Sequence, residues 1–256
     1  MLLAIDAGNS QTVIGLYRNQ QLAAHWRLTS SREQTDDEIA VLLRTLLRDV
    51  GEDPAAVTEV AVCSVVPALT TAYRELGASL FGTEPLIIDH RTADDLPILV
   101  DDPSSVGADR IANAVAARKH HGKPVIVVDL GTATTFDVVD GDGAYAGGVI
   151  APGIGISANA LFQRGARLGR VEIREPERMV GRTTEESIQA GIFYGAVGGV
   201  DHLVAGIVQE MGFPEDLPVV ATGGLASAIA SASSRITAVD EHLTLEGIRL
   251  VAERAT

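Results

Sequence analysis

The sequence predicts an α/β protein made of two similar domains, each with a small sheet and packed helices. An apolar run that ends in Asp-x-Gly occurs twice, at Asp6 and again at Asp129. Each copy is followed by two further apolar runs joined by tight turns, which is typical of three consecutive antiparallel strands. Because the two acids lie 123 residues apart (129 − 6), about half the chain, we expect domains over 1–113 and 114–256 around a cleft.

The remaining elements follow from apolar periodicity and turn residues. Strands are expected at 2–6, 13–17, 22–28, 59–66, 85–88, 125–129, 136–139, 145–150 and 219–221. Helices are expected at 39–50, 68–80, 108–121, 156–164, 183–211, 225–232 and 245–254. Capping boxes at Thr35-Asp-Asp-Glu38 and Thr183-Thr-Glu-Glu186 mark two helix starts. Each half thus follows the order β-β-β-α-β-α, and the last helix is expected to pack back on the first domain.

Composition narrows the classes of function. Acidic residues outnumber basic ones 34 to 20, a formal charge of −14, which disfavours binding to a nucleic-acid backbone. The single cysteine, Cys63, lies in an apolar run and has no disulfide partner, so we expect it to be buried in a reducing cytosol. The N-terminus is predicted to be a strand and not a signal peptide. With no run of 18 apolar residues, no membrane span is expected, and the prediction is a cytoplasmic protein.

The two acid-glycine turns are the strongest candidates for chemistry. They are Asp6-Ala-Gly8-Asn9-Ser10-Gln-Thr12 and Asp129-Leu-Gly131-Thr132-Ala-Thr134-Thr135. Glycine lets backbone amides approach an anion closely, and an acid at a strand end can hold Mg²⁺ or its waters. One such turn alone is more often a plain hairpin. Two of them, each after a buried strand and rich in Ser and Thr, favour a site for a polyphosphate.

Two further segments indicate a function only when they are considered together with the acid-glycine turns. Gly223 and Gly224 follow a predicted strand, where a flat nucleoside can lie against the backbone; an ordinary strand-to-helix turn explains them equally well. Asp109, beside Arg110 at a predicted helix start, can accept a proton from a substrate hydroxyl, although a helix-capping Asp is the commoner explanation. The sequence has no phosphate-binding loop of the form G-x-x-x-x-G-K-[ST] and no dinucleotide fingerprint after the first strand.

Taken together and in order, the motifs resemble a known family. They are Asp6-Ala-Gly-Asn-Ser, Thr35-Asp-Asp-Glu, Gly107-Ala-Asp-Arg-Ile-Ala-Asn-Ala, Asp129-Leu-Gly-Thr-Ala-Thr-Thr, Gly147-Gly-Val-Ile-Ala-Pro-Gly, Gly181-Arg-Thr-Thr-Glu-Glu-Ser-Ile-Gln and Thr222-Gly-Gly-Leu-Ala. No single motif is decisive, but the ordered set, from Leu3 to at least Ala226, resembles type III pantothenate kinase. Ser10, where the family often has Thr, and Ala190, where Ser is expected, depart from the pattern and remove no charge.

The resemblance implies a duplicated actin-like fold of the actin/Hsp70/sugar-kinase type and a homodimer that phosphorylates pantothenate from ATP. It implies Asp109 as general base and Gly107, Arg110 and Thr184 at the substrate. It implies an ATP site formed by Asp6 (through Mg²⁺), Gly8, Asn9, Thr12, Thr132, Gly223 and Gly224. Asp129 is implied to hold a monovalent cation, K⁺ or NH₄⁺.

Two other functions remain open on the sequence alone. The same fold can phosphorylate another small hydroxylated metabolite or hydrolyse ATP, since fold does not determine the substrate. A non-catalytic regulatory protein of this fold is the other alternative. The retention of Asp6, Asp109 and Asp129 argues against it, because a protein without catalysis has no chemical need for all three.

Overall fold

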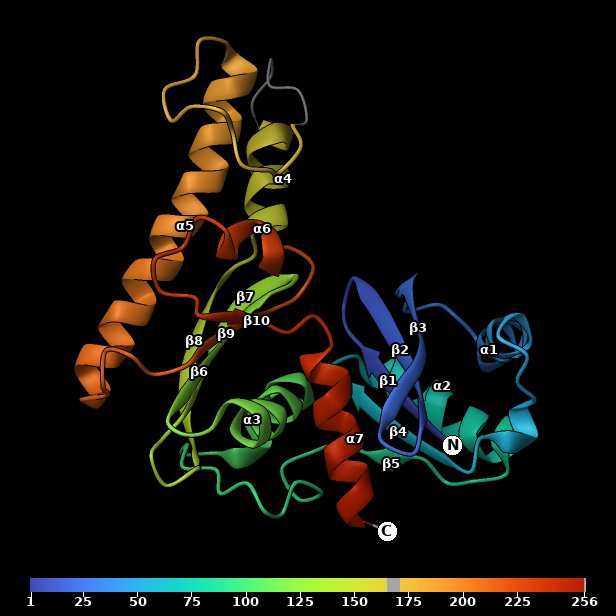
Figure 1. The fold of residues 1–256 in the computed structure, drawn as a ribbon. Coiled ribbons are helices and arrows are strands. Elements are labelled where there is room, and N and C mark those ends of the chain that lie inside the picture. Colours follow the sequence, from blue (N-terminus) through green and yellow to red (C-terminus); the bar gives the residue numbers. More distant parts are fainter. Residues whose placement is uncertain (165–170, 256) are drawn as a thin grey trace. The chain divides into compact units, whose positions relative to one another are not determined.

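A computed structural model of the chain describes residues 1–164 and 171–255. The chain divides into two compact units. The first comprises Met1–Ala116 together with the C-terminal segment from His242, and the second comprises Ala117–Glu241. Figure 1 shows a five-stranded sheet with helices in each unit. Each unit is described on its own below.

The sheet of the first unit has the strand order β3-β2-β1-β4-β5. Its strands are β1 (Leu2–Ala7), β2 (Gln11–Arg18), β3 (Gln21–Thr29), β4 (Glu59–Ser64) and β5 (Leu86–Ile87). The first three strands are antiparallel neighbours, whereas β4 pairs with β1, and β5 with β4, in parallel. The parallel pairing brings the carboxyl ends of β1 and β4 to the same edge of the sheet.

Helices cover both faces of this sheet. The helices are α1 (Asp36–Asp49), α2 (Pro67–Leu76), α3 (Ala108–His121), which continues into the second unit, and α7 (Leu243–Ala255). One face packs through side chains such as Leu3, Ile5 and Leu16 against α1 and α2. The other face contacts α7, which Figure 1 draws in red beside the strands. Short helical turns complete the unit at η1 (Pro54–Ala56), η2 (Gly77–Phe81) and η3 (Pro103–Ser105).

The sheet of the second unit repeats the topology of the first. Its order is β10-β9-β6-β7-β8, and its strands are β6 (Val125–Leu130), β7 (Ala133–Val139), β8 (Tyr145–Pro152), β9 (Val219–Thr222) and β10 (Ala238–Val239). Here too the first three strands are antiparallel neighbours, and β9 pairs with β6 in parallel. The duplication predicted from the two Asp-x-Gly turns is therefore confirmed at the level of strand order.

The helices of the second unit are α4 (Ile154–Arg164), α5 (Thr184–Met211) and α6 (Ala226–Ala230). One row of α5 side chains, including Phe193, Val200 and Val204, packs on β6, β7 and β9 in a buried apolar cluster. Figure 1 shows α5 extending well beyond the strands, with α4 alongside it.

Among the described residues, α5 is the one helix long and apolar enough to cross a membrane by length and composition. About a third of its most apolar window is buried, 33%. A single helix of this kind is weak evidence, because the core helix of a soluble protein satisfies the same criteria.

Most predicted elements are present, with differences at their ends. The helix expected over 68–80 begins at Pro67 and is α-helical only to Leu76, after which a π-type turn follows. The helix expected over 225–232 is a single turn, α6. At Thr35 the capping box is complete. At Thr183 only half of it forms, because the Glu186 carboxylate accepts from the backbone of Arg182 instead.

Candidate active site

The first acid-glycine turn joins β1 to β2. The backbone N–H of Gly8 donates to the carbonyl of Gln11 at 3.0 Å, which closes the turn. A Cβ at Gly8 would lie 3.0 Å from that same carbonyl oxygen, closer than carbon normally approaches oxygen. Asn9 and Ser10 are exposed at the tip. A side chain at position 8 would therefore crowd the turn itself, besides blocking the close backbone approach predicted for this glycine.

Thr12 faces inward, unlike its neighbours at the tip. Its side chain is buried, and its hydroxyl lies 2.8 Å from the hydroxyl of Ser30. Tyr73 of α2 also hydrogen-bonds to Thr12, and burial raises the pKa of Tyr73 to about 12. This hydroxyl network anchors the base of the turn to the sheet and α2, while a contact between Thr12 and phosphate stays a prediction.

Asp6 lies beside a buried thiol. It is half-buried on β1 and is paired in register with Cys63 on the parallel neighbour β4, so the two side chains share one face of the sheet. Cys63 is fully buried and hydrogen-bonds to Asp6. Burial, and then the negative charges of Asp6 and Asp109, raise the pKa of the thiol well above its usual range. Cys63 is therefore a neutral group next to both carboxylates.

Asp109 occupies the first turn of α3, where Gly107 makes room for it. The Oδ1 atom of Asp109 accepts from the backbone N–H of Arg110 at 2.8 Å. A Cβ at Gly107 would lie 2.5 Å from that oxygen, so any other residue would displace the carboxylate. Burial raises the pKa of Asp109, and the Arg110 hydrogen bond and charge only partly oppose the shift. A carboxylate with a raised pKa is a stronger base, as a proton acceptor requires.

The second acid-glycine turn joins β6 to β7 and is held by other glycines. Asp129 is paired in register with Thr222 on β9. A Cβ at Gly223, whose φ is +92°, would lie 2.6 Å from Asp129 Oδ1, and one at Gly131 would lie 3.2 Å from it. The Asp129 carboxylate is thus enclosed by bare backbone on two sides. Thr132 is exposed at the tip of this turn, as is Gly224 after β9.

A large apolar cavity lies between α4, α5 and the β7–β8 hairpin. Its volume is about 720 Å³, and Leu130, Thr134 and Phe136 line it from the sheet side. Thr184, the first residue of α5, lines it from the helix side and is exposed. The cavity has mostly carbon walls, so it is suited to an apolar chain or side chains and not to phosphates.

The structure groups the predicted residues by unit. In the first unit Asp6 and Asp109 both lie close enough to Cys63 to raise the pKa of its thiol, and in the second the backbone of Gly223 lies against Asp129. Sequence reasoning missed Cys63 as a neighbour of both acids. It also missed Gly153, where a Cβ would lie 2.0 Å from the carbonyl oxygen of Thr132. Cys63 belongs to none of the motifs, and Gly153 ends the Gly147–Gly153 motif, which carries no recognisable chemistry of its own, so no local signal points to either contact.

In the described parts of both units, protein side chains alone do not form a metal site. Residues 1–164 and 171–255 contain no group of three or more His, Cys, Asp or Glu side chains that could hold a metal ion. Asp6 nevertheless fits Mg²⁺ that takes most of its ligands from water and phosphate, because such sites use only one or two carboxylates.

Comparisons of the sequence with known proteins point to one family. The sequence model of the family described as type III pantothenate kinase matches residues 2–206. A type III pantothenate kinase from Myxococcus xanthus is 49% identical over 254 residues, 99% of this chain and 98% of that protein. Another, from Moorella thermoacetica, is 46% identical over the whole of both chains.

Solved structures share the fold at much lower identity. The activator of the 2-hydroxyisocaproyl-CoA dehydratase from Clostridium difficile, solved with bound ADPNP, aligns with a TM-score of 0.61 and 13% identity over 99% of this chain and 94% of that chain. The ethanolamine utilization protein EutJ from Carboxydothermus hydrogenoformans aligns with a TM-score of 0.59 and 16% identity, over 97% of this chain and 89% of that one. These likenesses confirm the duplicated actin-like fold.

Proposed function

Because the chain belongs to the type III pantothenate kinase family, we propose that it transfers the γ-phosphoryl group of ATP to the primary hydroxyl of pantothenate. The product is 4′-phosphopantothenate, and the reaction is the first step of coenzyme A biosynthesis. The observation that carries this proposal is the identity of nearly half of all residues over almost the full length of curated relatives. The site supplies the matching chemistry, an ionisable acid with a raised pKa on the first turn of a helix.

Asp109 is the general base in this mechanism. It accepts the proton of the pantothenate hydroxyl as the new P–O bond forms, and the raised pKa makes it better suited to that task than an exposed Asp. Arg110 holds Asp109 through its backbone N–H and offers its guanidinium to the pantothenate carboxylate. Gly107 keeps the space that Asp109 needs. Thr184 contributes a hydroxyl to the substrate from the start of α5.

The two turns bind ATP. Gly8, Asn9 and Thr12 from the first turn and Thr132 from the second contribute amides and short polar groups to the phosphates. Gly223 and Gly224 present bare backbone to the nucleoside. Asp6 is the residue that would hold Mg²⁺ or its waters, and the ion would neutralise part of the phosphate charge. Positioning and charge neutralisation supply most of the catalysis in phosphoryl transfer, so this division of labour is sufficient.

Asp129 is proposed to bind a monovalent cation, K⁺ or NH₄⁺. The fit rests on the close approach of backbone to its carboxylate, which Gly131 and Gly223 permit. Carbonyl and carboxylate oxygens are the ligands that hard cations prefer. The register partner Thr222, on the neighbouring strand β9, carries a hydroxyl on the same face of the sheet.

The enzyme is further proposed to be a cytoplasmic homodimer. Support comes from the apolar surface around α5, where Met179 and Val180 are 64% and 78% exposed. Several glycines of α5 lie in open space, with nothing within 4 Å of a Cβ built on them. An exposed apolar surface of this kind commonly marks a protein interface, and a second copy of the chain is the partner that the family resemblance implies.

The decisive assay is formation of 4′-phosphopantothenate from ATP and pantothenate at saturating Mg²⁺, with and without K⁺. Product that depends on K⁺ supports both the reaction and the cation site. Product that does not depend on K⁺ retains the kinase and removes the role of Asp129. If folded protein makes no product with pantothenate, the same assay run on other small hydroxylated metabolites distinguishes a different kinase from a regulatory protein.

A further inference from the structure

The segment that follows β3 is fastened to the first acid-glycine turn at three points. The backbone N–H of Ser30 donates to the carbonyl of Ser10 at 3.1 Å, and the Ser30 hydroxyl lies 2.8 Å from that of Thr12. The third contact is made by Arg32, whose Nη2 donates to Asn9 Oδ1 at 2.9 Å. All of these residues belong to the first unit. The two hydrogen bonds of Ser30 therefore help to hold Arg32 near the tip of the turn, in addition to the hydrogen bond of the arginine side chain itself.

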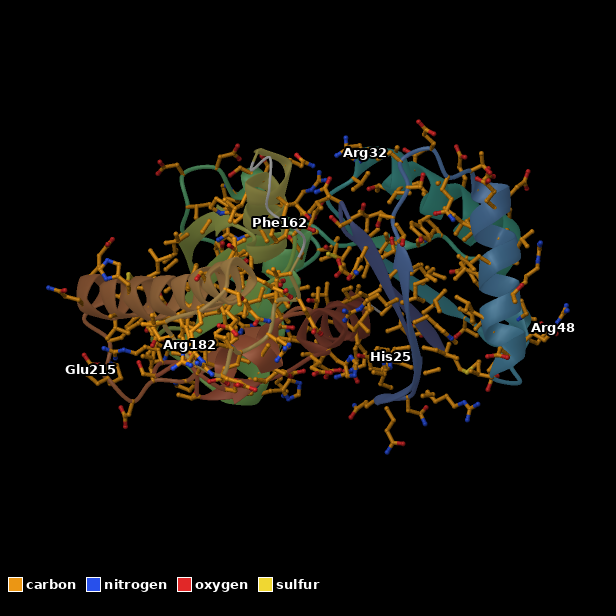
Figure 2. The ribbon with its side chains drawn as sticks, turned by 90° about the horizontal axis from the view of Figure 1, so that it is seen from above. His25, Arg32, Arg48, Phe162, Arg182 and Glu215 are labelled. Carbon is orange, nitrogen blue, oxygen red and sulfur yellow. The ribbon has the colours of Figure 1, made fainter. Side chains whose placement is uncertain are left out.

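Arg32 supplies the charge that this turn lacks. The exposed side chains of the turn are neutral, and the acid at its root, Asp6, is repelled by phosphate. A guanidinium has five N–H donors and binds phosphate in a bidentate manner. Within the described residues, Arg32 makes one hydrogen bond, to Asn9, and no ion pair. Its side chain is exposed, and Figure 2 shows it projecting from the ribbon at the end of the hairpin strands.

We propose that Arg32 is a phosphate-binding residue, whose guanidinium contacts the terminal phosphate of ATP while one of its N–H groups holds Asn9 in place. The inference rests on the proposed function, because it takes the first turn to be a phosphate site. It adds a cation from outside every motif that the sequence singled out. An arginine is better suited to this task than a lysine, since its planar fork can bond Asn9 and a phosphate oxygen at the same time.

A purely structural role for Arg32 predicts different behaviour. If the side chain only orders the Asn9 amide, the charge is not needed, and the diphosphate and triphosphate nucleotides are affected equally. If it contacts the terminal phosphate, the charge is required and the triphosphate suffers more. The glutamine variant, Arg32→Gln, removes the charge and keeps an N–H donor, two bonds nearer the backbone than the Nη2 that reaches Asn9, and Arg32→Lys keeps the charge without the fork.

The experiment is calorimetric titration of the full-length protein with the Mg²⁺ complexes of ADP and of AMPPNP, a non-hydrolysable ATP analogue. Arg32→Ala and Arg32→Gln are expected to weaken AMPPNP binding about tenfold, as loss of one charged hydrogen bond at an exposed site implies. ADP binding should change by less than about threefold on the same reasoning. Arg32→Lys should fall between. The matched control is Arg48→Ala, which removes an exposed arginine at the end of α1, and Figure 2 shows the two arginines well apart.

Three results would overturn the proposal: wild-type affinity for AMPPNP in Arg32→Ala, full rescue by Arg32→Gln, or an equal loss for ADP and AMPPNP. Failure of the proposed function is distinguishable from all of these. Wild-type protein that binds AMPPNP and yet phosphorylates no pantothenate would refute the assigned substrate and leave the Arg32 contact standing on its binding data.

Discussion

Replacing Asp109 with Asn tests the proposed general base with little change in shape. The amide oxygen of Asn can still accept from the backbone N–H of Arg110, the bond that Asp109 Oδ1 now makes at 2.8 Å. The space left by Gly107 accommodates either side chain, because the two are nearly isosteric. What the variant loses is the negative charge and the capacity to accept a proton. The fold should therefore remain while proton transfer is abolished.

The expected loss of turnover can be bounded from the chemistry. General base catalysis typically contributes about 10²–10⁴-fold. Phosphoryl transfer passes through a loose transition state in which the attacking hydroxyl has bonded little, so the lower part of that range, about 10²–10³-fold, is expected. That corresponds to roughly 2.7–4.1 kcal/mol in the activation barrier. The KM for pantothenate should change much less, because the ground-state contacts remain.

Whereas Asp109→Asn should lower turnover, it should not lower the stability of the fold. Because burial raises the pKa of Asp109 above its ordinary 3.8, the folded state holds this proton more tightly than the unfolded chain does. Stability therefore falls as pH rises from the unfolded value through the folded one, and above the folded value the cost of burying the charge is complete. Asn carries no such penalty, so the Tm of Asp109→Asn at pH 7 should equal or exceed that of the wild type.

The assay combines initial rates over a pH series with thermal unfolding of the same samples. The wild-type acid limb of kcat/KM should lie above pH 3.8 and be absent in the variant. A matched control is Asp37→Asn, another acid in the first turn of a helix, which should leave turnover unchanged and cost about 0.3–1 kcal/mol of stability through the helix dipole. Turnover of Asp109→Asn within about threefold of wild type would contradict a role that is expected to contribute at least 10²-fold.

Three further changes have definite expected outcomes. Gly247→Ala places a Cβ 1.9 Å from the Ala112 carbonyl oxygen, so urea unfolding should show a loss of about 1–3 kcal/mol, and an unchanged midpoint would contradict the close approach of α7 to α3. Gly195→Arg introduces a long charged side chain at a position where nothing lies within 4 Å of the Cβ. Light scattering should then detect monomers, and the Tm should not fall. Intact dimers would place the interface elsewhere. Cys63, whose burial and acidic neighbours raise its pKa, should react with a thiol reagent at pH 8 only after unfolding, and rapid labelling of the native protein would disprove its burial.

The fold was predictable because its signals are local. Each Asp-x-Gly turn, and the capping box at Thr35, is a motif of a few consecutive residues with a strong preference for one local conformation. The structure contains all three. The repeat at Asp6 and Asp129 then predicted two equivalent sheets. The same local reasoning extended α2 four residues too far, because the 77–81 segment keeps helical composition while its hydrogen bonds change to a π-type turn.

The candidate site was only partly predictable, because its neighbours come from register and tertiary packing. The position of Cys63 beside Asp6 depends on which residues of β1 and β4 are paired, and a shift by one residue would turn the thiol to the opposite face. Threonine is a residue type that is common in turns. The position of Thr12 on β2 nevertheless directs its side chain into the buried network with Ser30. Arg32 belongs to no motif and is brought to the turn only by the path of the chain after β3.

The two sheets are equivalent, yet the family resemblance assigns their acids to different cations, and the register partners of the two acids also differ. Asp6 and Asp129 occupy the same register position, but Asp6 is paired with Cys63 and Asp129 with Thr222. A neutral thiol is a poor ligand for a hard cation, so the Mg²⁺ proposed at Asp6 would take its other ligands from phosphate and water. At Asp129, where a monovalent cation is proposed, the register partner is a threonine in place of the thiol, and the backbone of Gly131 and Gly223 lies close to the carboxylate. The duplication thus provides two carboxylates in one geometry, and the neighbouring strand differentiates them.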